Sequence, residues 1–176
     1  MDGSDEVALT AFGDGATSQG DVNEAMIFSA SYQSPVVFFC QNNQWAISEP
    51  TSVQTKVPLF KRGEGFGVPG VRVDGNDIIA MYAVARASLD SVRAGHGPML
   101  IEAFTYRMGA HTTADDPSKY RDAAVTEQWK AKDPISRLRA HLEKSGLADD
   151  GFFAEVDAEA DALAARIRKA CMEMPE

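Results

Sequence analysis

Two oxygen-bearing side chains, Asp14 and Asn43, are the first candidates for chemistry in this chain. Each follows an apolar run that is typical of a buried β-strand, over residues 7–12 and 35–40. The carboxyl ends of parallel strands meet at one edge of a sheet, so this carboxylate and this amide are expected to share an ion although 43 − 14 = 29 positions separate them. Oxygen ligands beside tight glycines and a helix start predict a site for magnesium and a phosphate-bearing ligand.

Small residues follow Asp14, where the chain is expected to enter a helix. Backbone N–H groups at Gly15, Ala16 and Thr17 can receive diphosphate oxygens, and the glycine allows a close approach. The chain has no P-loop lysine, which disfavours a nucleoside triphosphate. The alternative is that residues 13–15 form only a turn, residues 42–43 only a loop, and the small side chains only permit tight packing.

His111 is the best candidate for proton transfer. It lies on a polar loop, residues 107–122, close in sequence to Arg107 and Asp115. A histidine titrates near neutral pH and suits general acid–base work. The alternative is a structural histidine that bonds Asp115. The other two histidines, His96 in a turn and His141 in a charged helix, are expected to be exposed.

The elements that must position these residues alternate between strands and helices. Strands are predicted at 7–12, 35–40, 71–73 and 99–106, and helices at 21–31, 77–94, 133–144 and 152–174, with Asp21 and Glu24 as a capping box. The alternation predicts an α/β fold with a doubly wound, mostly parallel sheet flanked by helices.

Two stretches complete this organisation. Residues 41–70 lack periodicity and are predicted to be a long irregular functional segment. We expect residues 1–147 to form one domain and residues 148–176 a helical extension. The extension carries an apolar stripe that predicts core packing, formed by Val156, Ala160, Leu163, Ile167, Ala170 and Met174.

Composition excludes several function classes. The formal charge of −9 argues against a nucleic-acid surface, and no apolar run is long enough for a membrane span. Cys40 and Cys171 form no disulfide or metal pattern, and Cys40 is expected to be buried. The opening is acidic and polar rather than signal-like. We therefore expect a cytoplasmic protein, or one of the mitochondrial matrix in a eukaryote.

Four segments in order resemble a known family. Residues 13–43 are similar to the thiamine diphosphate motif, which opens with GDG and closes with NN. The segments FFCQNNQWAISEP, GVRVDGND and EAFTYRMGAHTTADDPSKYR resemble the alpha subunit of 2-oxo acid dehydrogenases, the decarboxylating components of the pyruvate and branched-chain complexes. The resemblance runs from about residue 7 to about residue 147. GDG alone is weak evidence, whereas the ordered set is specific.

The resemblance implies thiamine diphosphate and Mg²⁺ as cofactors. It implies that the metal ligands are the side chains of Asp14 and Asn43 and the carbonyl of Trp45. It further implies that His111 is catalytic and faces the thiazolium ring, and that the cofactor-binding residues are Gly13, Asp14, Gly15, Ala16, Asn43, Ile47, Arg107 and His111.

The resemblance also implies partners. These are a beta subunit in an α2β2 heterotetramer, the lipoyl domain of the acyltransferase component, and a small 2-oxo acid. The glutamate that activates the aminopyrimidine belongs to the beta chain in this family. Family members carry a long N-terminal half before the GDG motif, so the chain is expected to be the C-terminal part of the subunit, with a thiamine-diphosphate-binding fold incomplete at its N-terminus.

The expected activity is thiamine-diphosphate-dependent oxidative decarboxylation of pyruvate or a branched-chain 2-oxo acid, with acyl transfer to lipoamide. An acetoin dehydrogenase alpha subunit shares most of these motifs. A transketolase-like enzyme shares only GDG and NN. A truncated assembly module without catalytic activity is the third alternative.

Overall fold

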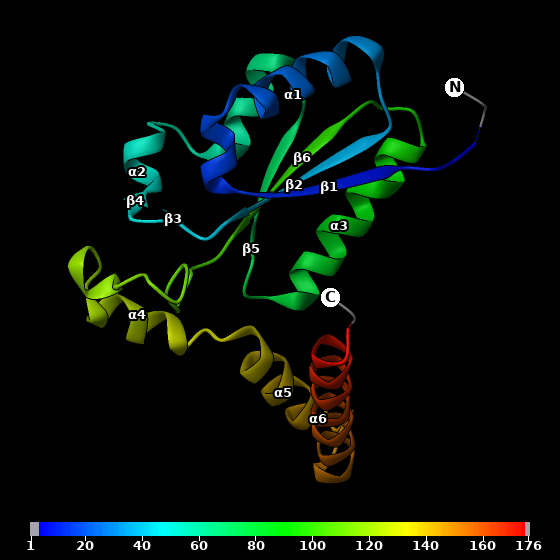
Figure 1. The fold of residues 1–176 in the computed structure, drawn as a ribbon. Coiled ribbons are helices and arrows are strands. Elements are labelled where there is room, and N and C mark those ends of the chain that lie inside the picture. Colours follow the sequence, from blue (N-terminus) through cyan, green and yellow to red (C-terminus); the bar gives the residue numbers. More distant parts are fainter. Residues whose placement is uncertain (1–3, 175–176) are drawn as a thin grey trace. The chain divides into compact units, whose positions relative to one another are not determined.

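The computed structural model describes residues 4–174 of the chain. The main sheet has four strands, all of them parallel (Figure 1). The order across the sheet is β1, β2, β6, β5, and every neighbouring pair is parallel. The strands are β1 (Ala8–Gly13), β2 (Val36–Asn42), β5 (Gly70–Asp74) and β6 (Met99–Phe104). The predicted α/β fold with a parallel sheet is therefore confirmed.

Helices cover both faces of this sheet, as Figure 1 shows for α1 (Gly20–Tyr32) and α3 (Ile78–Arg93). Successive strand side chains point to opposite faces, so β2 and β6 each contribute to two cores. One core contains Met26 of α1 with Phe38, Cys40 and Leu100. The other contains Val37 and Ile101 with Val73 and the α3 residue Val92. Strands buried on both faces explain the continuous apolar run in β2.

The irregular segment after β2 contains short elements that sequence periodicity does not reveal. They are β3 (Trp45–Ala46), β4 (Glu49–Pro50), α2 (Thr51–Gln54) and the 3₁₀ segment η2 (Leu59–Phe66). Two further 3₁₀ segments are η1 (Asp14–Ser18) and η3 (Pro117–Lys119), and α4 (Ala123–Lys130) follows the polar loop. None is longer than eight residues, so its pattern repeats too few times to be recognised in the sequence.

The starts of α3 and α1 differ in whether a side chain caps them. Asp77 caps α3 by accepting the backbone N–H groups of Ile79 and Ala80. The capping box predicted for α1 is wrong, because α1 begins at Gly20 and its N-cap residue makes no side-chain capping bond. Asp21 lies instead in the first turn, where its negative charge interacts favourably with the helix dipole.

The chain divides into two compact units, residues 1–134 and 135–176. The predicted boundary lies later, after residue 147, and the two predicted domains remain a prediction. The second unit contains most of α5 (Pro134–Lys144) and all of α6 (Asp150–Met172). Core packing of the α6 apolar stripe is a wrong prediction, because Val156, Leu163 and Ile167 are exposed.

In the described residues, no helix is long and apolar enough to span a bilayer.

A buried carboxylate joins the strands near their carboxyl ends. Glu102 of β6 is 0% exposed. Its Oε1 accepts bonds from Arg72 of β5 and from the amide of Asn42 in β2, each at 2.7 Å. Its Oε2 accepts the backbone N–H of Phe60 in η2 at 2.9 Å. Three strands and η2 are thus held by one side chain.

We predict that Glu102→Gln lowers the free energy of unfolding by about 3 kcal/mol, because an amide cannot accept all three bonds or balance Arg72. Urea unfolding followed by the fluorescence of Trp45 and Trp129 measures this. Asp90→Asn is the control, since Asp90 pairs with Arg93 on the exposed face of α3, and it should cost less than about 1 kcal/mol. Equal losses in both variants would contradict the assigned role of Glu102.

Candidate functional site

The structure brings the two predicted oxygen ligands together. Gly13 at the end of β1 pairs with Gln41 of β2, so the residues that follow each strand are neighbours. The backbone N–H of Asn43 donates to Oδ1 of Asp14 at 3.3 Å. The Asp14 side chain is 1% exposed. The edge-of-sheet argument correctly places these two residues, while their role as metal ligands remains a prediction.

Asp14 is a buried carboxylate with neutral partners. Its Oδ2 accepts bonds from Oγ1 of Thr51 at 3.1 Å and Nε2 of Gln54 at 3.2 Å. Across residues 4–174, no ion pair to Asp14 is formed. A buried charge requires a counter-charge or a metal, so this carboxylate fits a bound cation. Sequence reasoning missed Thr51 and Gln54, which belong to the four-residue helix α2 and carry no recognisable signal.

The available donors fit Mg²⁺ better than a soft metal. Within the described part of the chain, no group of three or more His, Cys, Asp or Glu residues is placed to hold a metal. A ligand set here would combine one carboxylate with amide and carbonyl oxygens. Magnesium is usually bound by one or two carboxylates, with phosphate oxygens and water completing the octahedron. The residues present therefore fit Mg²⁺ bound together with a diphosphate.

Backbone bonds hold Asn43 against β6. The carbonyl of Asn42 accepts the N–H of Thr105 at 2.9 Å, and the carbonyl of Asn43 accepts the N–H of Arg107 at 3.2 Å. These bonds continue the β2–β6 pairing beyond the strand ends. Oδ1 of Asn43 accepts the N–H of Trp45 at 3.1 Å, which turns the chain and draws Trp45 toward Asn43.

Arg107 contacts three other predicted site residues, which are Trp45, Ile47 and His111. Its guanidinium donates to the carbonyls of Trp45 at 3.1 Å and Ile47 at 2.6 Å, and to the hydroxyl of Tyr120 at 3.2 Å. Ile47 has a positive φ of 56°, which β-branched residues rarely adopt. Nδ1 of His111 lies 3.4 Å from the same guanidinium. The metal-ligand, cofactor and catalytic predictions therefore converge on one region.

The loop that carries His111 is closed by its own side chains. Oδ2 of Asp115 accepts the backbone N–H of His111 at 2.8 Å and the hydroxyl of Tyr120 at 2.6 Å. Arg121 donates to the carbonyls of Arg107, Met108 and Gly109. Asp115 thus bonds the backbone of His111 and not its imidazole, which is exposed.

The backbone at Gly15 lies very close to Ala46 of β3. A Cβ on Gly15 would lie 2.9 Å from the Cβ of Ala46, so only glycine allows η1 to approach β3 this closely. Gly13 precedes η1, and the carbonyl of Ala16 accepts the N–H of Gln19 at 3.0 Å. This 3₁₀ turn lies between Gly13 and the helix predicted at residues 21–31, and α1 starts at Gly20. Diphosphate binding by these residues stays a prediction.

The remaining titratable candidates are structural or exposed. His96 and His141 are exposed, as expected. Cys40 is buried in the core, also as expected, and burial raises the pKa of its thiol to about 12. A thiol that stays protonated at neutral pH is not a nucleophile.

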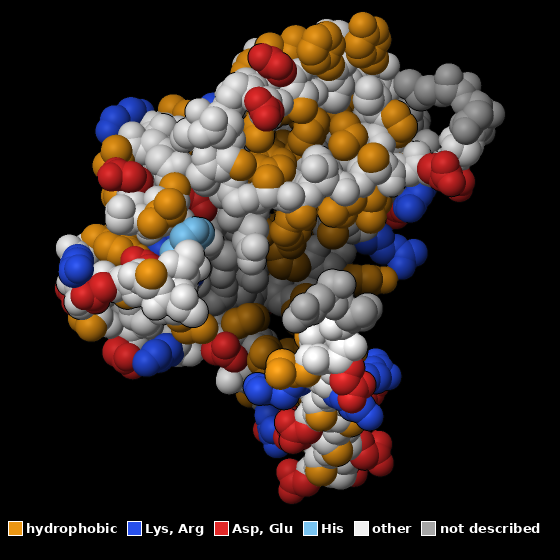
Figure 2. Space-filling model, in the orientation of Figure 1, with side chains coloured by type: hydrophobic (Ala, Val, Ile, Leu, Met, Phe, Trp, Pro, Cys, Tyr) orange, Lys and Arg blue, Asp and Glu red, His pale blue; other side chains and the backbone are white. Residues whose placement is uncertain are grey.

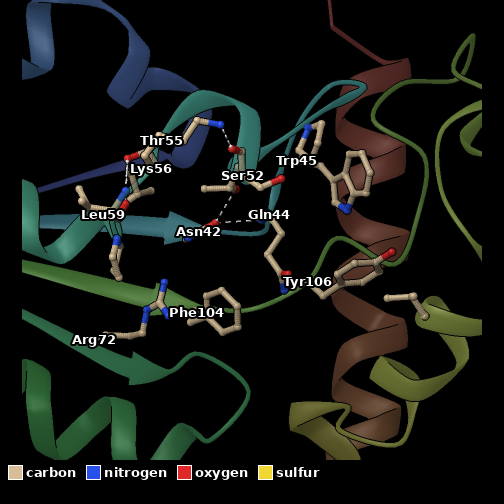
Figure 3. Close-up of a pocket in the computed structure, with 15 residues that line it drawn as sticks. Asn42, Gln44, Trp45, Ser52, Thr55, Lys56, Leu59, Arg72, Phe104 and Tyr106 are labelled. Carbon is tan, nitrogen blue, oxygen red and sulfur yellow. Dashed lines mark hydrogen bonds between the residues drawn. The ribbon is translucent and has the colours of Figure 1, made fainter.

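A pocket of about 450 Å³ adjoins the site and shares Asn42, Trp45 and Thr51 with it. Figure 3 shows Arg72 and Phe104 on one side of this pocket and Thr55 and Lys56 on the other. The remaining lining residues are Gln44, Pro50, Ser52, Val57, Pro58, Leu59, Tyr106 and Val125. A pocket of this size, with mixed apolar and cationic walls, can hold a small organic anion.

Comparison with known proteins matches residues 1–175 to the family model "Dehydrogenase E1 component". The chain is 47% identical over 98% of its length to "3-methyl-2-oxobutanoate dehydrogenase subunit alpha" of Mycobacterium tuberculosis, covering 47% of that protein. It is 46% identical over 81% of its length to "Pyruvate dehydrogenase E1 component subunit alpha" of Acholeplasma laidlawii, covering 42%. It is 42% identical over 98% of its length to "2-oxoisovalerate dehydrogenase subunit alpha 2, mitochondrial" of Arabidopsis thaliana, covering 36%. The chain spans about half the length of the curated relatives it matches, or less.

The two hydrogen bonds that the Asp115 carboxylate accepts lead to a testable prediction about its pKa. The N–H of His111, followed by the hydroxyl of Tyr120, lowers the pKa of Asp115 below 3.8. Because the folded-state pKa is lowered, the contribution of Asp115 to the closed loop is present above this ordinary value and is lost as the pH falls through the lowered pKa.

We expect Tyr120→Phe to raise the pKa of Asp115 toward its ordinary value, because one donor to the ionised form is removed. Titration of the carboxyl ¹³C signal by NMR measures the shift. Tyr32→Phe, on the exposed side of α1, is the control and should leave the Asp115 pKa unchanged. An unchanged pKa in Tyr120→Phe would show that this bond does not stabilise the carboxylate.

Proposed function

Because the chain belongs to the dehydrogenase E1 component family, we propose that it supplies the metal and diphosphate half of the active site of a thiamine-diphosphate-dependent 2-oxo acid dehydrogenase. The observation that carries this proposal is the buried Asp14 carboxylate. It has only neutral partners and is bonded to Asn43, beyond which Trp45, Arg107 and His111 follow in one hydrogen-bonded series.

Each residue has a role in holding the cofactor. Asp14, Asn43 and the carbonyl of Trp45 would hold Mg²⁺, and the backbone N–H groups of Gly13, Gly15 and Ala16 would bind the diphosphate. Arg107 fixes the carbonyls of Trp45 and Ile47, and its positive charge would favour a bound diphosphate. Thr51 and Gln54 orient the Asp14 carboxylate. Thiamine diphosphate, when bound, supplies the electron sink for decarboxylation.

His111 is the residue of this chain that moves protons. Its imidazole is exposed and lies beside Arg107, while its backbone is fixed by Asp115. The fixed backbone limits the positions that the ring can take, which favours transfer along one direction. The group that exchanges a proton with His111 would be the oxygen of the substrate carbonyl or the sulfur of lipoamide.

The comparisons favour a branched-chain 2-oxo acid as the substrate. The relatives named for 3-methyl-2-oxobutanoate and 2-oxoisovalerate match over 98% of this chain, whereas the pyruvate dehydrogenase subunits match over 81–82%. Pyruvate is the second candidate, since those subunits are 46% identical to the chain.

Association with other chains is part of the proposal. The relatives are alpha subunits, which supports a beta subunit as partner, in an α2β2 assembly that serves a lipoyl domain. Leu9 on the edge strand β1 and Phe28 and Tyr32 on α1 are exposed, and Figure 2 shows apolar side chains gathered on this face. Exposed apolar patches of this kind mark interaction surfaces.

The proposed compartment of the protein is the cytoplasm, or the mitochondrial matrix in a eukaryote.

Metal binding tests the proposal directly. In the assembled alpha–beta protein, Mn²⁺ binding in the presence of thiamine diphosphate is measured by electron paramagnetic resonance. We expect Asp14→Asn to weaken Mn²⁺ binding by about tenfold or more, because the set loses its one carboxylate. Asp21→Asn, which removes an exposed acid on α1, is the matched control. Equal affinity in the two variants would exclude Asp14 as a ligand.

The role of His111 is tested with His111→Ala in the same assembly, with 3-methyl-2-oxobutanoate and pyruvate as substrates. Loss of a general acid–base group slows the reaction by about a hundredfold to ten-thousandfold. We expect lipoamide acylation to slow by such a factor while the affinity for thiamine diphosphate changes little. His96→Ala, in an exposed turn, should leave both constants unchanged. Near-normal acylation in His111→Ala would remove this residue from the catalytic set.

A further inference from the structure

The helix α6 carries a heptad seam. Its apolar side chains recur at alternating intervals of three and four residues, which is the spacing of the a and d positions of a coiled coil. The seam consists of Phe153, Val156, Ala160, Leu163, Ile167 and Ala170. A spacing of this regularity favours packing against another helix along the whole seam.

Within the second unit, over residues 135–174, α5 covers only the first position of this seam. Phe153 is 8% exposed and lies under the guanidinium of Arg139 in α5, 4.2 Å from the ring centroid. By contrast, Val156 is 47% exposed, Leu163 44% and Ile167 54%. Figure 2 shows apolar side chains open to solvent along this helix. The seam from Val156 onward is therefore free to take a partner.

The charges on α6 are segregated along its length. All five acidic residues of the helix precede Leu163: Asp150, Glu155, Asp157, Glu159 and Asp161. All three basic residues follow it: Arg166, Arg168 and Lys169. Two parallel copies of this helix would place like charges side by side. Two antiparallel copies would place the acidic half of each beside the basic half of the other, and would also oppose their helix dipoles favourably.

We propose that α6 is a self-association surface, on which the α6 of a second copy of this chain packs in antiparallel orientation. In the register that sets a positions against d positions, Val156 lies opposite Ile167 of the second copy and Ala160 opposite its Leu163. Ala160 then faces the larger Leu163, and the branched side chains of Val156 and Ile167 face each other. The flanking g positions bring Glu159 beside Arg166 of the second copy, and the two-fold symmetry repeats this pair.

The paired seam is short. From Val156 to Ile167 it extends about 17 Å at the rise of an α-helix. An interface of this length self-associates weakly and reversibly, and it suits a contact that is reinforced when other subunits hold two copies together.

Sedimentation equilibrium of the 176-residue chain over a wide concentration range tests the proposal. The wild-type chain should show a reversible monomer–dimer equilibrium, and Leu163→Glu should abolish it. Ala165→Glu is the matched control, because it adds the same charge at an outward position and should leave dimerisation nearly unchanged. Circular dichroism verifies that the helices persist. A chain that stays monomeric, or a dimer that survives Leu163→Glu, would overturn the proposal.

Charge reversal tests the antiparallel register. Glu159→Arg alone, or Arg166→Glu alone, converts two attractive contacts per dimer into two repulsive ones and should weaken dimerisation by about tenfold. The double variant restores opposite charges and should recover most of the wild-type affinity. Failure of the double variant to recover, while both single variants are weakened, would exclude this register and with it the antiparallel pair.

Discussion

The site depends on one buried carboxylate that fixes where three strands end. Glu102 binds Asn42 of β2, Arg72 of β5 and the backbone of η2, and water does not reach it. A buried charge is tolerated only when its bonds are complete, so the strands cannot slide past one another without leaving this group unpaired. The positions of the residues that follow β2 and β6 are set by this constraint.

A polar series connects this constraint to the ligand oxygens. Oδ1 of Asn42 accepts the N–H of Gln44 and lies 3.2 Å from the hydroxyl of Thr51, which also lies 3.1 Å from Asp14. The carboxylate that we propose as a metal ligand is therefore oriented by the network that closes the sheet. Precise placement of a ligand by buried neighbours is how proteins preorganise a metal site, and neutral neighbours leave the negative charge available to the ion.

The sequence predicts a helix or strand correctly where its pattern of apolar residues repeats over enough positions. The strands show as short apolar runs, and α3 shows a broad apolar face with Asp77 at its start. The elements that were missed are short. The helices α2 and α4 have four and eight residues, too few turns for a stripe to be recognised. The false capping box at Asp21 arose because Gln19 and Gly20 carry no start signal. The apolar stripe of α6 was recognised, but spacing alone does not distinguish a core from an uncovered face.

The sequence alone determined which residue types could do chemistry here, the order of strands and helices, and the expectation that Asp14 and Asn43 meet at a sheet edge. These properties follow from local spacing and from the geometry that all parallel sheets share. Tertiary structure alone decided that Thr51 and Gln54 bond the Asp14 carboxylate, that Arg107 binds the carbonyls of Trp45 and Ile47, and that Asp115 bonds the backbone of His111. The physical reason is that these hydrogen bonds depend on distances and angles of a few ångströms and degrees across irregular loops, which no periodic pattern encodes.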